Sequence, residues 1–142
     1  MPTQLQSPDI QAFAIGFPLT LLHAGVTMLI LVLGTTLYAM LTPHKEIVLI
    51  RDGNAAAALS LGGVMIGLAI PLAVSLSAST SIVEIAVWGV ATMAVQLLVF
   101  RIVDIVLRGL PQRIQDGEVA AAALLIGAKL ATALVLAAAV AG

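Results

Sequence analysis

Long stretches without charge are the feature of this sequence that most restricts its fold. Three of them, residues 12–41, 53–83 and 85–100, contain no aspartate, glutamate, lysine or arginine, and in a fourth, residues 119–142, the charged residue is Lys129. Apolar runs of about 18 residues or more are typical of helices that cross a bilayer. The chain is also 61% hydrophobic and 9% charged, which excludes an ordinary water-soluble domain of this length. We therefore expect four transmembrane helices.

The other way to cross a bilayer is a β-barrel, whose strands alternate polar and apolar residues. These runs are instead apolar on every face and rich in alanine and leucine, which favour helix. The sequence thus predicts an all-α integral membrane protein with a single membrane domain over residues 1–142. The first span is interpreted as retained rather than as a cleaved signal, because residues 1–9 contain no lysine or arginine.

An internal repeat organises these spans. Residues 50–54, followed by alanines, reappear 64 residues later as residues 114–118, again followed by alanines. Repeat one covers about residues 12–76 and repeat two about residues 82–142. Since each copy contains two spans, the second begins on the same side of the membrane as the first, so the repeats are parallel.

The placement of basic residues predicts the topology. Five of the six lie in or beside the first and third connections, whereas residues 75–81 of the second connection are uncharged; the five are Lys45, Arg51, Arg101, Arg108 and Arg113. Cytoplasmic connections carry the excess of lysine and arginine. We therefore expect the first and third connections in the cytoplasm and both termini outside it.

The two repeated turns are acidic. Asp52 and Asp116 stand just before their long helices, where a carboxylate can cap free amides, and the glycine after each permits a tight entry. We interpret these aspartates as N-caps. The functional alternative is a paired cytoplasmic docking surface made by both turns, with Glu46, Asp52, Gly53 and Asn54 in the first and Asp116, Gly117 and Glu118 in the second.

Small residues recur at equivalent places in the second and fourth spans. They are Gly63 and Gly67 in the first copy and Gly127 and Ala131 in the second. Helices in lipid associate through close backbone approach at such residues. We expect these two spans to meet each other or a neighbouring subunit, and the protein to be a homo-oligomer or a subunit of a membrane complex.

Lys129 is the residue that needs a special explanation. Counting about 1.5 Å per residue from residue 119 puts it roughly 16 Å deep, near the bilayer centre, where an ammonium is costly. The same count puts His23 and Gln96 at similar depth, so the three are predicted to form one polar layer. Lys129 is then deprotonated, exposed to a wet cavity, bonded to these neutral groups, or paired with an anion from another molecule.

The depth count also bears on the acidic residues. It puts Glu84 and Asp104 farther from Lys129 in depth than a lysine side chain reaches. Asp104 is instead expected to pair with Arg101, three residues away on the same helix face.

Several kinds of chemistry are missing from the sequence. There is no cysteine, no triad or carboxylate pair at one depth, and too few ligands for a metal site. We expect no enzyme activity, no cofactor and no nucleic-acid partner. The leading hypothesis is a self-associating membrane interaction or assembly subunit. The alternative is a small oligomeric channel or carrier for an ion or small solute, with Lys129 at the midplane, and an enzyme subunit whose cofactor a partner holds stays open.

One stretch of the sequence resembles a known family. Its motif is Glu46-x-x-x-Ile50-x-x-Gly53-Asn54-Ala55-Ala56-Ala57, followed by Leu59-x-Leu61-Gly62 and Gly67. This pattern resembles the first repeat of an uncharacterised bacterial inner-membrane family typified by YjfL, whose members are similar in length, four-span layout and duplication. The second copy departs from the first by having Glu118 where the first has Asn54. The resemblance implies a bacterial cytoplasmic membrane location, with the lipid bilayer as a partner, and no catalytic residues.

Overall fold

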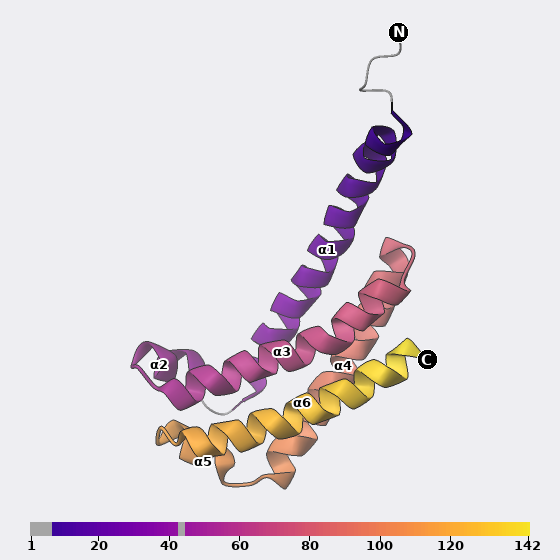
Figure 1. Ribbon diagram of the computed structural model, residues 1–142. Helices are drawn as coiled ribbons and strands as arrows, with labels where there is room; N and C mark the ends of the chain where they lie inside the picture. The colour runs from indigo at the N-terminus through magenta and orange to yellow at the C-terminus, as the bar shows by residue number, and fades with distance from the viewer. Residues whose placement is uncertain (1–6, 43–44) are drawn as a thin grey trace.

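The computed structural model describes residues 7–42 and 45–142, and within these residues the chain forms six helices and no strand (Figure 1). They are α1 (Pro8–Leu41), α2 (Glu46–Arg51), α3 (Ala55–Ala78), α4 (Ile82–Val106), α5 (Leu110–Gln115) and α6 (Val119–Ala141). The four long helices, α1, α3, α4 and α6, are each long and apolar enough to cross a membrane. The prediction of an all-α membrane protein with four spans is confirmed.

Helix α3 is the centre of the bundle, because it packs against each of the other five helices. Its most extensive contact is with α6, which lies along it in Figure 1. Glycines make this packing close. A Cβ added at Gly63 would lie 2.5 Å from Cγ1 of Ile126 in α6, and one added at Gly67 would lie 2.6 Å from the ring of Phe100 in α4. The small residues of α3 therefore act within the chain.

The equivalent small residues of α6 face outward. Gly127 has no atom within 4 Å of the place where its Cβ would stand, and Ala131 is exposed. The buried face of α6 is a separate stripe at every fourth residue, made by Ala121, Leu125, Lys129, Ala133 and Ala137.

The two repeated connections have the same geometry. Each contains a six-residue helix, α2 or α5, then a glycine at positive φ, +88° at Gly53 and +85° at Gly117, and then the start of a long helix. The short helices begin at residues 46 and 110 and the long ones at 55 and 119, which is the same 64-residue offset. Both connections lie at the same end of the bundle in Figure 1.

The expected capping role of Asp52 and Asp116 is wrong. Both residues end the short helices, and the N-cap positions of α3 and α6 fall two residues later, at Asn54 and Glu118. The reason is the intervening glycine, which turns the chain between the two helices and moves the cap beyond the aspartate.

Helix α1 packs along its second half. Its buried residues, Ile30, Gly34 and Tyr38, form one face at every fourth position. Residues 8–22, in contrast, are exposed on every face of the helix. Figure 1 shows this first half projecting away from the other helices. At 34 residues, α1 is about 51 Å long, which exceeds the roughly 30 Å hydrocarbon core of a bilayer.

The close approach at Gly63 can be tested against its neighbour Gly62. We expect Gly63→Ala to lower the free energy of unfolding by about 1–3 kcal/mol, because the added methyl group meets the branched side chain of Ile126. Gly62→Ala is the matched control, since nothing lies within 4 Å of its added Cβ. Thermal unfolding in mild detergent, followed by circular dichroism, measures both. Equal effects of the two substitutions would contradict this packing.

Candidate functional site: a buried ion pair beside a cavity

Lys129 is buried where three helices meet. Its side chain is 1% exposed, and its Nζ lies 2.7 Å from Oδ1 of Asp104 on α4. Nζ also donates to the hydroxyl of Tyr38 on α1, and that hydroxyl donates to Oδ2 of Asp104 at 3.3 Å. The ammonium lies 4.4 Å from the ring centroid of Tyr38 and 5.4 Å from that of Phe100, within cation–π range. This set of contacts ties α1, α4 and α6 together.

The expectation that Asp104 lies beyond the reach of Lys129 is wrong. Side chains on a helix lean toward its N-terminus. The start of α4 lies beside the end of α6, because Glu84 and Val140 line one cavity. The end of α4 lies beside the first half of α6, because Asp104 and Leu125 line another. The two helices therefore run in opposite directions, and the Asp104 and Lys129 side chains lean toward each other. A count of depth from Cα positions misses both displacements.

The expected pairing of Asp104 with Arg101 is also wrong. In the described part of the chain, the ion pair of Asp104 is with Lys129. Arg101 is closer to Asp104 along the helix, but the buried ammonium of Lys129 needs a countercharge and pairs with Asp104 instead.

Two residues of the predicted polar layer lie apart from this set of contacts. Gln96 is 0% exposed, and neither atom of its side-chain amide has a hydrogen-bond partner among residues 7–42 and 45–142. His23 is half-buried on α1, four turns before Tyr38. No bond links either residue to Lys129 in the described chain, whose Nζ is held by Tyr38 and Asp104. The described residues also contain no group of three or more histidine, aspartate or glutamate side chains that could hold a metal ion.

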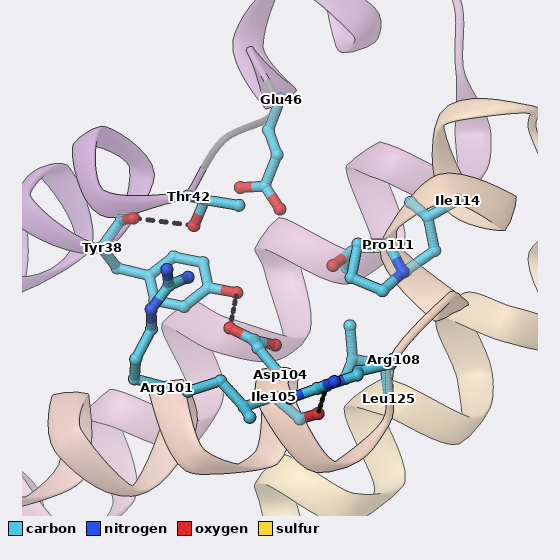
Figure 2. A pocket seen from close by; sticks show the side chains of 11 residues that line it. Tyr38, Thr42, Glu46, Arg101, Asp104, Ile105, Arg108, Pro111, Ile114 and Leu125 are labelled. Carbon is cyan, nitrogen blue, oxygen red and sulfur yellow. Dashed lines mark hydrogen bonds between the residues drawn. The ribbon is translucent and has the colours of Figure 1, made fainter.

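A cavity of about 370 Å³ adjoins the ion pair, between the end of α1, α2, the end of α4 and α5. Figure 2 shows Glu46 reaching toward Thr42 and Tyr38 from α2, and Asp104 from α4. The residues that line it are Tyr38, Thr42, Glu46, Ser60, Arg101, Asp104, Ile105, Arg108, Pro111, Ile114 and Leu125.

Glu46 is a buried residue of this cavity whose carboxyl group lacks a partner. It is 5% exposed, and its Oε2 has no hydrogen-bond partner among the described residues. Burial raises the pKa of Glu46 to about 7; the charge of Lys129 opposes this rise and that of Asp104 adds to it. At neutral pH this carboxyl group is therefore close to half ionised.

From its charge and position Glu46 is expected in a turn, and its burial is not predicted. The signal lay in the spacing, because Leu49 and Ile50 follow it by three and four residues and share its helix face. Both pack against the apolar cluster below the turns. Tyr38 was missed in the same way, since it continues the buried face of Ile30 and Gly34.

Asn54 joins the two repeated turns. Its Oδ1 accepts a bond from the amide of Ala57 at 2.9 Å and caps α3, while its Nδ2 donates to the carbonyl oxygens of Ile114 at 3.0 Å and Gln115 at 2.9 Å, at the end of α5. A glutamate cannot donate such bonds. Glu118, at the equivalent place, instead accepts a 2.6 Å bond from Nε of Arg113, and this bond lowers the pKa of Glu118.

Known proteins with similar sequences are inner-membrane proteins. Residues 12–140 match the family described as Domain of Unknown Function, DUF350. Two relatives are the proteins named UPF0719 inner membrane protein YjfL from Escherichia coli strain K12 and from Escherichia coli O157:H7. Each is 36% identical over 107 residues, which cover 75% of this chain and 80% of the relative. No solved structure matches the chain.

The energetic role of the ion pair can be tested by removing one or both charges. Lys129→Met leaves Asp104 buried and uncompensated, so we expect a loss of about 3–5 kcal/mol in the free energy of unfolding. Adding Asp104→Leu removes the uncompensated charge and should recover most of this loss. Arg113→Met is the control and should have little effect, because the Arg113–Glu118 pair is solvent-exposed. If the double variant is no more stable than Lys129→Met, the pairing is not the source of the effect.

The pKa of Glu46 predicts a pH dependence of stability. The unfolded carboxyl ionises near 4.5 and the folded one near 7, so between these values the folded state binds more protons and the free energy of unfolding falls as pH rises. The shift corresponds to about 3 kcal/mol. Glu46→Gln should therefore match the wild type near pH 4 and exceed it by up to that amount above pH 7.

Melting curves from pH 4 to pH 8 in lipid-free detergent measure this difference. Asp52→Asn, the same change at an exposed position of the same connection, should leave the pH dependence of the wild type intact. Parallel curves for the wild type and Glu46→Gln would show that Glu46 titrates normally.

Proposed function

This chain belongs to the DUF350 family, and on that premise we propose that it is a non-enzymatic membrane protein that associates with copies of itself to form an assembly subunit in the bacterial inner membrane. The family description names no activity. The proposal is therefore supported by the faces that the helices leave unpaired.

The observation that carries this proposal is the free half of α1. Residues 8–22 form a regular helix that the remaining helices do not cover. Small residues recur on one of its faces at every fourth position: Ala12, Gly16 and Thr20. The hydroxyl of Thr20 donates to the carbonyl of Gly16 at 3.1 Å, so this face carries no unsatisfied hydroxyl donor. Such a face lets a second helix approach closely in lipid, where no hydrophobic force drives association.

A second outward face supports the same proposal. Ala123, Gly127 and Ala131 lie at every fourth position of α6 and are exposed. Beside them, a groove of about 420 Å³ runs between α4 and α6, lined by Val99, Ala131, Thr132, Val135, Leu136 and Ala139. Two small-residue faces on different helices allow one chain to contact two neighbours.

The channel or carrier alternative has less support. It requires Lys129 on a wet lumen, together with His23 and Gln96. The lysine side chain is instead 1% exposed, and its Nζ contacts Tyr38 and Asp104. Within one copy, its charge is already neutralised.

We also propose that the connections containing α2 and α5 are cytoplasmic and that both termini lie outside. The support is the charge of these connections, which contain or flank five of the six basic residues.

Self-association can be tested at Gly16 and Ala14, which are both exposed but about 200° apart around α1. We expect Gly16→Leu to weaken association about tenfold or more, since the larger side chain blocks the close helix contact. Ala14→Leu, on the opposite face, should not. Energy transfer between labelled copies in vesicles, measured over a range of dilution, gives both values. A wild type that stays monomeric in vesicles would refute the proposal.

The absence of cysteine makes the topology easy to test. A membrane-impermeant maleimide added to intact bacterial spheroplasts should label Gly142→Cys and should label Asp52→Cys only after the membrane is opened. Both positions are exposed in the fold. Labelling of Asp52→Cys in intact cells would reverse the proposed orientation.

A further inference from the structure

We propose that the cavity beside the ion pair binds a headgroup that carries both a primary ammonium and a phosphate, of the phosphoethanolamine type. The ammonium lies against Glu46 and the phosphate against Arg101 and Arg108. This site is independent of the proposed self-association, which uses other faces of the chain.

The ammonium end is indicated by Glu46. A buried carboxylate oxygen without a donor is costly, and in native proteins it nearly always has a partner. Oε2 of Glu46 has none among residues 7–42 and 45–142, although the side chain is 5% exposed and lines the cavity. The neighbouring buried cation is already used, because Lys129 is bonded to Asp104 and Tyr38. A ligand that brings N–H donors and positive charge satisfies this oxygen.

The size of the cavity favours an organic ligand over a single water. A water molecule takes about 30 Å³ of liquid volume, whereas the cavity holds about 370 Å³. Ligand sites in proteins usually begin near 300 Å³.

Two arginines at the end of α4 indicate where the phosphate of the ligand binds. Arg101 and Arg108 are seven residues apart, two turns along one face of α4, and both line the cavity. Both arginines are exposed, and the hydrogen bond of Arg108 to the carbonyl of Ile105, at 3.2 Å, is made by its Nε and does not use its terminal nitrogens. Guanidinium groups bind phosphate through paired N–H donors. Figure 2 shows these arginines on α4 and Glu46 on α2, so the two walls carry opposite charge.

The remaining lining suits the apolar part of a lipid. Ile105, Pro111, Ile114 and Leu125 form the apolar share of the cavity wall. The cavity also lies where the spans end, at the level where lipid headgroups meet protein. The shared ligand chemistry is thus phosphoethanolamine, from a membrane lipid or from a soluble ester.

Titration of Glu46 adds a pH dependence to this binding. Ammonium binding needs the ionised carboxylate, and burial holds the pKa of Glu46 near 7. The charged or titratable groups around it are Lys129 of α6, Asp104, Arg101 and Arg108 of α4, and Tyr38 of α1. Affinity should therefore rise about tenfold between pH 6 and pH 8 in the wild type.

Native mass spectrometry and thermal shifts on the delipidated full chain in detergent test the site. The probes are short-chain phosphatidylethanolamine, phosphatidylglycerol, phosphatidylcholine and soluble glycerophosphoethanolamine. We expect phosphatidylethanolamine to bind at least tenfold more tightly than phosphatidylglycerol, which lacks the amine, and phosphatidylcholine, which lacks N–H donors. Equal affinity for phosphatidylglycerol would overturn the proposal. Binding of the soluble ester at the same strength identifies a soluble ligand, and weak binding of it identifies a lipid.

Variants assign the two ends of the ligand. Glu46→Gln should lose the preference over phosphatidylglycerol and the rise of affinity with pH, and Arg108→Gln should weaken all phosphate probes. Asp52→Asn and Gly16→Leu should bind as the wild type does, which separates this site from self-association. If Glu46→Gln does not fold, the pH series on the wild type decides, because pH-independent binding would exclude Glu46 from the site.

Discussion

The structure depends on one buried ion pair, between Lys129 and Asp104, with Tyr38 bonded to both. An unpaired ammonium inside a bilayer is expensive, and lipid offers it no partner. Its position can therefore be stable only where a carboxylate from another helix meets it. This requirement fixes how α4 and α6 are rotated about their axes, and through Tyr38 it fixes the end of α1 against them.

The elements of the fold follow directly from the sequence, whereas the contacts between them do not. Long uncharged runs predict the spans because, inside a bilayer, a helix satisfies all backbone hydrogen bonds within the segment. The partner of Lys129 was not predictable in the same way, because depth counted along one helix takes no account of how another helix runs beside it. Glu46 illustrates a second reason. Its charge suggests a solvated turn, and its burial depends on α2 folding back against α3.

The two repeats differ at the positions that form the site. With the 64-residue offset, Lys129 corresponds to Met65, Asp104 to Met40, Tyr38 to Ile102 and Glu46 to Leu110. Each polar group thus has an apolar counterpart, and Met40, Met65 and Ile102 are exposed on the outside of the bundle. Asn54 and Glu118 differ in the same sense, since only the amide can cap two helices at once. The repeated backbone is therefore used for two purposes, one polar and buried, the other apolar and facing the bilayer.

This difference bears on why the buried charges exist. Ion pairs in a nonpolar interior are often no more stabilising than well-packed apolar residues of similar volume, and the rest of this bundle is held by glycines, alanines and branched side chains without charge. The pair fixes how the helices meet, but stability alone therefore does not explain why Lys129, Asp104 and Glu46 are charged. The ammonium of Lys129 meets Asp104 near the end of α4, and Asp104 and Glu46 line one cavity. That concentration is better explained by a ligand than by the fold, because a purely structural charge needs a partner but does not need a space beside it.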